Sequence, residues 1–164
     1  MNLIIDIGNT ATKIAIFEQG EIKETLRCSN QSLDGLASLC NRYPIRKGIL
    51  SSVISINEEI RKQLSLLPFP ILEFTYQTPV PIRNLYQTPQ TLGVDRLAAV
   101  VAAYHQKPHC PALVIDAGTC ITYDFLDEHG QYLGGNISPG MEMRFKALHS
   151  FTDKLPHVQA SGET

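Results

Sequence analysis

Apolar and polar residues alternate along the beginning of this chain of 164 residues. Ile14 and Ile16 follow a period of two, and the alternation resumes from Ile22 to Leu26, as is typical of half-buried strands. The polar stretch 18–21 interrupts the alternation and contains a glycine, which suits a hairpin turn. The pattern therefore predicts a meander of three strands within residues 2–27.

Later segments change between helical and strand spacing. A helix is expected from a cap at Ser32 to about Arg42, with apolar residues on one face. The remaining expected elements are a strand at 45–51, a helix at 57–66, a strand at 69–74, a helix at 94–105, a second meander at 111–135 and a helix at 141–149. Three prolines predict an irregular loop over a site at 75–91. This order of elements indicates an α/β protein.

The sequence repeats itself after 110 positions. Residues 3–10 read LIIDIGNT and residues 113–120 read LVIDAGTC, so each copy is an apolar strand that ends in Asp-x-Gly. We expect Asp6 and Asp116 at strand ends, each followed by a turn. Gly8 and Gly118 can adopt backbone angles closed to other residues, and they let an anion approach the N–H groups that follow.

A carboxylate beside such a turn would repel a phosphate group unless Mg²⁺ stood between them. The two turns therefore indicate binding of a metal–nucleotide complex rather than a bare anion. A plain hairpin turn is the alternative for either copy taken alone. The matching register of the second copy favours the phosphate site.

Composition narrows the possible classes of protein. A net charge of −2 and the lack of a long Lys/Arg run disfavour nucleic-acid binding. Four cysteines without C-x-x-C spacing disfavour zinc and disulfide frameworks. No apolar run is long enough to span a bilayer, and the first expected strand begins at Asn2, so we expect no membrane association and a cytoplasmic location.

Three motifs resemble those of the type III pantothenate kinases. They are DIGNT at 6–10 followed by Lys13, LGVDR at 92–96, and DAGT at 116–119 with GGNISPG at 134–140. The resemblance implies the duplicated ribonuclease H-like (actin-like ATPase) fold, which acetate and sugar kinases, hexokinase, actin and Hsp70 share. It implies mixed sheets flanked by helices, a first lobe at 1–92, and the N-terminal part of a second lobe at 93–164.

The resemblance also implies an activity. Type III enzymes use ATP to phosphorylate pantothenate, the first step of coenzyme A biosynthesis, and they use Mg²⁺ and a monovalent cation, K⁺ or NH₄⁺. They act as homodimers. Enzymes of this type continue well beyond the helix expected to end near His149, so the second lobe should be incomplete here and should expose apolar surface.

Residue roles follow from the resemblance position by position. It implies ATP contacts from Asp6, Ile7, Gly8, Asn9, Thr10, Ala11, Thr12, Lys13 and Thr119. It implies a pantothenate pocket from Tyr86, Gly93, Val94, Asp95 and Arg96, with Asp95 as the catalytic base. Asp116 would bind the monovalent cation, and Asp6 would act on Mg²⁺ through the phosphates.

Some of these roles have physical support and also plainer alternatives. The planar guanidinium of Arg96 suits the carboxylate of pantothenate, whereas a surface pair with Asp95 at a helix start would need no ligand. Lys13 as a solvated strand residue and Tyr86 as loop packing stay open. For the whole chain, the alternatives are a non-catalytic nucleotide-binding or regulatory protein, and a kinase or phosphohydrolase acting on another small acid or sugar.

Overall fold

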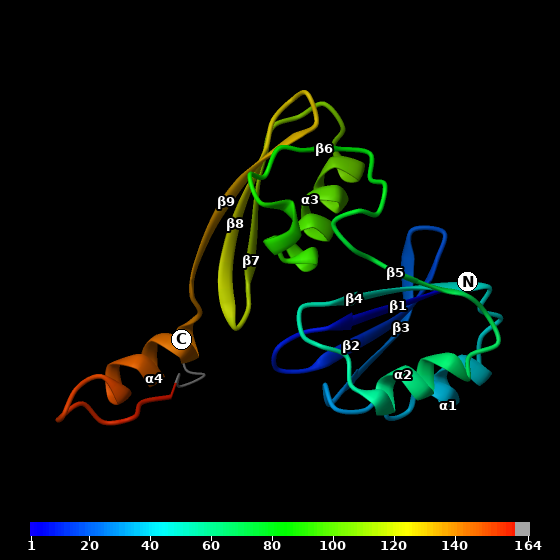
Figure 1. The fold of residues 1–164 in the computed structure, drawn as a ribbon, viewed down its shortest axis with the longest axis horizontal. Helices are drawn as coiled ribbons and strands as arrows, with labels where there is room; N and C mark the ends of the chain where they lie inside the picture. The colour runs from blue at the N-terminus through cyan, green and yellow to red at the C-terminus, as the bar shows by residue number, and fades with distance from the viewer. Residues whose placement is uncertain (160–164) are drawn as a thin grey trace. The chain divides into compact units, whose positions relative to one another are not determined.

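The computed structural model describes residues 1–159 as an α/β protein with two sheets (Figure 1). Its strands are β1 (Asn2–Ile7), β2 (Thr12–Glu18), β3 (Glu21–Cys28), β4 (Lys47–Ser52), β5 (Ile71–Glu73), β6 (Arg83–Asn84), β7 (Ala112–Ala117), β8 (Cys120–Leu126) and β9 (Gln131–Pro139). Its helices are α1 (Leu36–Asn41), α2 (Glu58–Ser65), α3 (Val94–Gln106) and α4 (Met141–Ser150), and a 3₁₀ turn spans Pro89–Thr91. Both predicted meanders are present.

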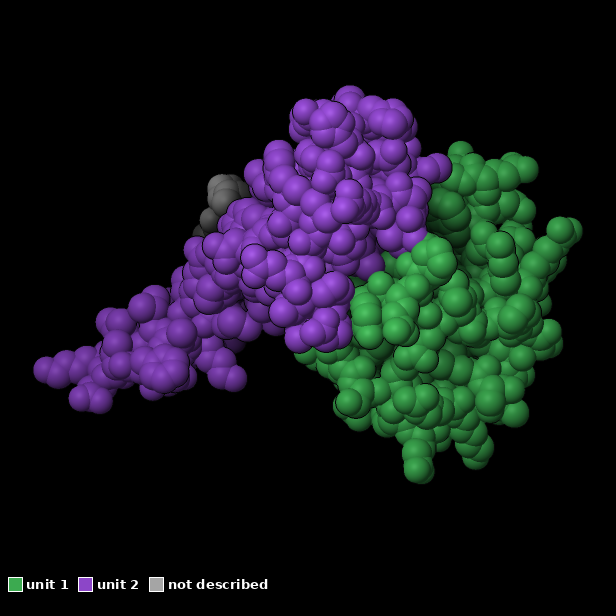
Figure 2. All heavy atoms as spheres, turned by 45° about the horizontal axis from the view of Figure 1, so that its top comes forward, with its two compact units in different colours: residues 1–79, 93–95 green, residues 80–92, 96–164 purple. Residues whose placement is uncertain are grey.

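The chain forms two compact units, which Figure 2 colours separately. One contains Met1–Pro79 with Gly93–Asp95, and the other contains Val80–Leu92 with the chain from Arg96 onward. Residues 80–92, which we expected in the first lobe, pair with the second sheet through β6 and β9.

The first unit is built on a mixed sheet with the strand order β3-β2-β1-β4-β5. β1 pairs antiparallel with β2 and parallel with β4, which places it at the centre of the sheet. Leu3, Ile5 and Ile7 are fully buried on one face, where they form a single core with residues of α1 and α2. Figure 1 shows both helices on this face.

The second unit has a mixed sheet with the strand order β6-β9-β8-β7. Leu113 and Ile115 occupy the positions of Leu3 and Ile5 in the sequence repeat, but they are 61% and 56% exposed. Phe125 pairs directly with Leu113 and is 42% exposed. The apolar surface expected on the second lobe is therefore present, and we call Leu113, Ile115 and Phe125 its outer face.

The repeat does not keep its register across the two Asp-x-Gly turns. Asp6 pairs with Lys13, whereas Asp116 pairs with Thr122, so the second turn is one residue shorter. The N–H of Gly8 donates to Ala11 O at 3.1 Å, but that of Gly118 donates to Cys120 O at 2.9 Å. A shift of one residue reverses which face of the sheet each side chain occupies, so the copies differ beyond the turn.

Two local expectations were wrong. The first helix begins at Leu36 after Gly35, which has a φ of 84°, and the Ser32 hydroxyl donates to Asp34 Oδ1 instead of capping the helix. The segment 75–91 contains the short strand β6 and a 3₁₀ turn, because distant β9 supplies a pairing partner that local proline spacing does not reveal.

Candidate functional site

The first Asp-x-Gly turn joins β1 to β2 at one end of the first sheet. Asp6 is half-buried, and directly opposite it lies the exposed Lys13. Residues opposite one another in an antiparallel pair point to the same face, so the side chains of Asp6 and Lys13 project from the same face of the sheet. Asn9 and Thr10 are exposed at the tip of the turn.

Asn30 fixes this turn from the chain that follows β3. Its side-chain amide donates to Asn9 O at 2.8 Å and to Gly8 O at 3.4 Å. These bonds hold the carbonyl groups of the turn on the side of Asn30. Sequence analysis did not select Asn30, because a lone asparagine beyond a strand carries no local signal.

The glycines of the two turns have a different role from the one expected. Neither Gly8 nor Gly118 has a positive φ. A Cβ on Gly8 would lie 3.2 Å from Ala11 O, so this position is limited by close approach of the backbone. At Gly118 a Cβ would meet Cys120 O at 3.8 Å, an ordinary contact.

Two buried hydroxyl groups lie near the end of β1. Thr12 Oγ1 and Ser51 Oγ have no hydrogen-bond partner within residues 1–159. Thr12 is fully buried between its neighbours Ile7 and Cys28 on the flanking strands. The structure gives its side chain no route to a ligand in solvent.

The second Asp-x-Gly turn joins β7 to β8 and leaves Asp116 and Thr119 exposed. Gly140, at the start of α4, donates its N–H to Thr119 O at 3.0 Å. A Cβ on Gly140 would collide with the carbonyl oxygens of Gly118 and Thr119. The GGNISPG motif therefore supports the second turn through a close backbone contact, which only glycine allows.

The LGVDR motif spans the start of α3. Asp95 is half-buried in the first turn of this helix, where a carboxylate is favoured by the helix dipole. It groups with the first unit, whereas the next residue, Arg96, groups with the second. Arg96 is only 6% exposed, so the plainer alternative of a surface pair between Asp95 and Arg96 does not describe this side chain.

Arg96 belongs to a buried polar cluster within the second unit. Its Nη2 donates to Asp124 Oδ1 at 2.6 Å and its Nε donates to both carboxylate oxygens of Asp124. The Tyr132 hydroxyl donates to the same Oδ1 at 2.6 Å, and the Tyr86 ring stacks on that of Tyr132. We call Tyr86, Arg96, Asp124 and Tyr132 the arginine cluster.

Burial and hydrogen bonding shift the protonation equilibria of this cluster. Burial is the largest single influence and lowers the pKa of Arg96. The hydrogen bonds to Asp124, together with the charge interactions of Arg96 with Tyr132, Asp124 and Tyr86, outweigh burial, and the net shift of the pKa is upward. Burial, followed by the hydrogen bond to Asp124, raises the pKa of Tyr132 well above its usual range. Arg96 therefore stays charged and Tyr132 stays protonated throughout the physiological range.

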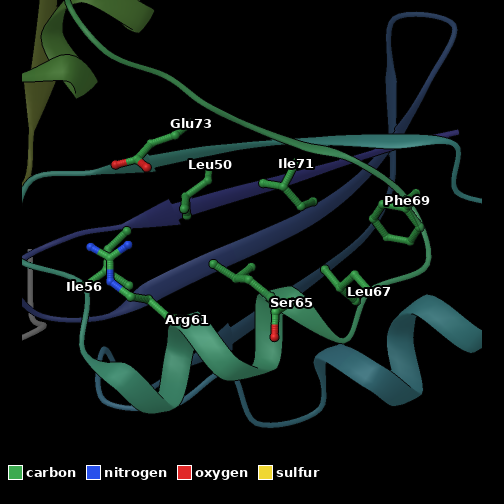
Figure 3. Close-up of a pocket in the computed structure, with 9 residues that line it drawn as sticks. Leu50, Ile56, Arg61, Ser65, Leu67, Phe69, Ile71 and Glu73 are labelled. Atoms are coloured by element: carbon green, nitrogen blue, oxygen red, sulfur yellow. The ribbon is translucent and has the colours of Figure 1, made fainter.

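A separate hollow of about 410 Å³ lies in the first unit between α2 and the strands β4 and β5 (Figure 3). Its wall is mostly apolar and includes Leu50, Phe69 and Ile71, with Arg61 and Glu73 as charged members. None of the predicted site residues lines it. A search for the functional site by cavity shape would therefore select this hollow and miss the residues of the three motifs.

The donor groups fit a nucleotide-bound metal ion better than a protein-enclosed one. Within the described part of the chain, no group of three or more His, Cys, Asp or Glu side chains could hold a metal ion. Mg²⁺ keeps several waters and binds through one or two carboxylates plus substrate phosphates. Asp6, half-buried beside the exposed turn, is suited to that arrangement.

The structure brings together some predicted residues and separates others by unit. Tyr86 and Arg96 are in contact, with Arg96 Cζ 5.8 Å from the ring centroid of Tyr86. Asp6 and Lys13 are neighbours across two strands. The turn containing Thr119 belongs to the other unit from residues 6–13. Sequence analysis missed Asp124 and Tyr132. In β8 the apolar Ile121, Tyr123 and Phe125 alternate with polar residues, so the pattern places Asp124 on the polar face, yet it is only 1% exposed.

The fold and these motifs place the chain in the class of proteins with the duplicated actin-like ATPase fold. A 2-dehydro-3-deoxygalactonokinase-like protein from Sinorhizobium meliloti is similar in fold, with a TM-score of 0.50 and 14% identity. The alignment covers 93% of this chain and 57% of that one. At this identity the likeness supports the fold alone.

The chain belongs to the type III pantothenate kinase family, whose model matches residues 2–163. It is 64% identical over 163 residues to a type III pantothenate kinase of Phocaeicola vulgatus, and 58% identical over 162 residues to one of Bacteroides fragilis. Both alignments cover 99% of this chain and 67% of the relative. The resemblance and the fold class are confirmed.

This family phosphorylates pantothenate with ATP in coenzyme A biosynthesis. The chain spans about two thirds of the length of the curated relatives that it matches. Among the helices of residues 1–159, none is long and apolar enough to cross a membrane.

Proposed function

We propose that this chain itself transfers the γ-phosphoryl group of ATP to the hydroxyl of pantothenate. The observation that carries the proposal is the buried, charged Arg96 next in sequence to Asp95 at the start of α3. A protein that only senses nucleotide needs phosphate turns but no guanidinium built into its interior beside a candidate base. Burying this charge is costly unless it is paired and hydrogen-bonded, and the bonds of Arg96 to Asp124 meet that requirement.

The phosphates of ATP bind at the first turn, and Thr119 is a further residue that contacts ATP. Gly8 already uses its N–H within the turn, so the donors for phosphate are the backbone and side chains of Asn9 and Thr10, with the ammonium group of Lys13 beside them. Asp6 acts on Mg²⁺ through the phosphate groups. When bound, Mg²⁺ neutralises charge that develops on the phosphoryl oxygens.

Asp95 is the group that receives the proton of the pantothenate hydroxyl. A carboxylate is too weak a base to remove a proton from an alcohol before the transfer begins. It can orient the hydroxyl and accept the proton late in a loose transition state. Asp95 lies in the first turn of α3, where the helix dipole favours a negatively charged side chain.

Arg96, together with Tyr86, Gly93 and Val94, binds pantothenate. The substrate has a carboxylate at the end away from its phosphorylated hydroxyl, and a guanidinium recognises a carboxylate through paired N–H groups. Asp95, the base, and Arg96, which binds the carboxylate, are adjacent in the chain. Their positions therefore define the direction in which pantothenate lies.

Three further features of the family are included in the proposal. Asp116, exposed at the end of β7, binds a monovalent cation, K⁺ or NH₄⁺. The active form is a homodimer. The location is cytoplasmic, where ATP is supplied.

A coupled ADP-release assay with Mg-ATP and potassium tests the proposal. ADP release should depend on pantothenate and should disappear in Asp95→Asn. Asp153→Asn, an exposed carboxylate beyond α4, is the matched control and should keep full activity. Release of ADP or phosphate without pantothenate would favour a hydrolase, and release supported by another acid or sugar but not by pantothenate would contradict the substrate.

A further inference from the structure

Asp124 connects Arg96, the residue proposed to bind the substrate carboxylate, to the interior of the second unit. It is 1% exposed, lies on β8, and accepts hydrogen bonds from α3 and from β9. We propose that Asp124, supported by the hydroxyl of Tyr132, is a positioning residue that fixes the guanidinium of Arg96 for the carboxylate of the substrate. This inference rests on the proposed function, because it concerns the residue that would bind pantothenate.

The geometry of the ion pair determines the plane of the guanidinium. Arg96 meets Asp124 side-on: Nε is 3.0 Å from Oδ1 and 3.1 Å from Oδ2, and Nη2 is 2.6 Å from Oδ1. Two neighbouring nitrogens of a rigid fork bonded to one carboxylate leave the fork no rotation about its long axis. The end-on edge, formed by Nη1 and Nη2, then points in one defined direction.

Aromatic rings restrain the same guanidinium from a second direction. Tyr86 and Tyr132 stack with ring centroids 6.2 Å apart and an angle of 9° between planes. Arg96 Cζ lies 5.8 Å from the centroid of Tyr86, within the range of a cation–π contact. Gly134 makes room for this arrangement, since a Cβ there would lie 3.3 Å from the Tyr86 ring.

The backbone of β9 is also adapted to the carboxylate. A Cβ on Gly135 would lie 2.8 Å from Asp124 Oδ1 and would collide with the carbonyl oxygen of Tyr123. Residue 135 pairs directly with Asp124 across the two strands. The two consecutive glycines of the GGNISPG motif therefore provide space for the arginine cluster.

A positioning role explains why an ion pair is buried here. Replacing a buried pair by apolar residues is often neutral or stabilising, so burial alone does not show a stabilising function. A guanidinium held in advance loses little freedom when a carboxylate arrives, which favours binding. The negative charge of Asp124 also balances Arg96 while the substrate is absent.

The first unit contains a chemically matched group that serves as a control. Glu24 accepts from Arg42 Nη2 at 2.6 Å and from the Tyr43 hydroxyl at 2.7 Å. Arg42 is half exposed there, and none of these residues is a predicted site residue. Replacing Glu24 removes the same kinds of hydrogen bond and leaves the residues of the arginine cluster unchanged.

Binding and kinetics of the full chain test the proposal. Pantothenate affinity, measured by titration calorimetry, should fall about tenfold in Asp124→Asn, as expected for loss of a charge-assisted hydrogen bond. Tyr132→Phe should weaken it about threefold. KM for pantothenate should rise in parallel, whereas kcat and Mg-ATP affinity should change less than about twofold. Glu24→Gln should leave all four quantities unchanged.

The Nε–H proton of Arg96 provides a readout independent of turnover. Its NMR signal, assigned by its loss in Arg96→Lys, should exchange slowly with water in the parent chain and rapidly in Asp124→Asn. Tyr132→Phe gives the same comparison if Asp124→Asn does not fold.

Unchanged pantothenate affinity in a folded Asp124→Asn or Tyr132→Phe variant with a rapidly exchanging Arg96 proton would overturn the positioning role. An equal loss of ATP and pantothenate affinity would also overturn it, because the effect would then be general. Absence of pantothenate binding by the parent chain would instead refute the proposed function, and the positioning role with it.

Discussion

The two copies of the repeat predict losses of stability of very different size for the same substitution. Leu3→Ala removes buried methyl and methylene groups, since Leu3 is fully buried in the core of the first unit. Leu113→Ala removes the same groups at the equivalent position of the outer face, where Leu113 is 61% exposed. The difference in the free energy of unfolding therefore measures how differently the two sheets are covered.

The magnitude follows from burial. Three carbon atoms at about 0.8 kcal/mol each contribute roughly 2.4 kcal/mol at Leu3. A residual cavity of about 60 Å³ at roughly 24 cal/mol per Å³ contributes about 1.5 kcal/mol more, so Leu3→Ala should cost about 4 kcal/mol. At Leu113 only the buried two fifths of the transfer free energy applies and no cavity forms, which gives about 1 kcal/mol.

Urea unfolding followed by two-dimensional NMR provides the assay, because signals from each unit report its own transition. The chain has no tryptophan, so a single fluorescence probe would not separate them. Leu3→Ala should lower the free energy of unfolding of the first unit by about 4 kcal/mol, and Leu113→Ala should lower that of the second by only about 1 kcal/mol. Equal losses at the two positions would refute the assignment of the outer face as uncovered surface.

Three other substitutions test single contacts. Asn30→Ala should weaken ATP binding severalfold, because it removes the bonds that hold the first turn, each worth about 1 kcal/mol. The control Asn2→Ala should leave ATP affinity unchanged. Equal ATP affinities of the parent chain and Asn30→Ala would exclude a role for Asn30. Hydrogen bonds from the Tyr43 hydroxyl and then from Arg42 lower the pKa of Glu24, so the stability that Glu24 contributes should be present above pH 4.5 and lost as the pH falls through the lowered pKa. If the parent chain and Glu24→Gln still differ in free energy of unfolding in acid, this assignment is wrong. Burial and Asp124 raise the pKa of Tyr132 above the range in which tyrosine ordinarily ionises. The tyrosinate absorbance that the chain gains between about pH 9 and about pH 11 should therefore be the same in Tyr132→Phe. A smaller gain in the variant would show that Tyr132 ionises in that range in the parent chain.

Local sequence pattern was sufficient for elements whose partners are near in the chain. The two meanders, α2 and α3 follow apolar periodicity, and Asn57 caps α2 by accepting from the N–H of Ile60. The pattern failed at Ser32, because its hydroxyl finds Asp34 before it can cap a helix. It also failed at β6, whose partner β9 is more than forty residues away along the chain.

The candidate site shows the same limit. Asp-x-Gly repeats and the LGVDR motif were sufficient to select the turns and Arg96. They did not reveal the carboxylate that holds Arg96, because Asp124 meets it only through packing of α3 on the second sheet. The ungapped repeat also concealed the difference of one residue between the two turns, which backbone hydrogen bonds alone determine.

Direct detection of the phosphorylated product tests the central claim most directly. The chain, incubated with Mg-ATP, potassium and pantothenate, should give a new phosphomonoester signal in ³¹P NMR as the γ-phosphate signal of ATP declines. Asp95→Asn should give none, although it should still bind ATP. A folded, ATP-binding parent chain that yields no phosphorylated pantothenate would contradict the proposal that this chain is itself a pantothenate kinase.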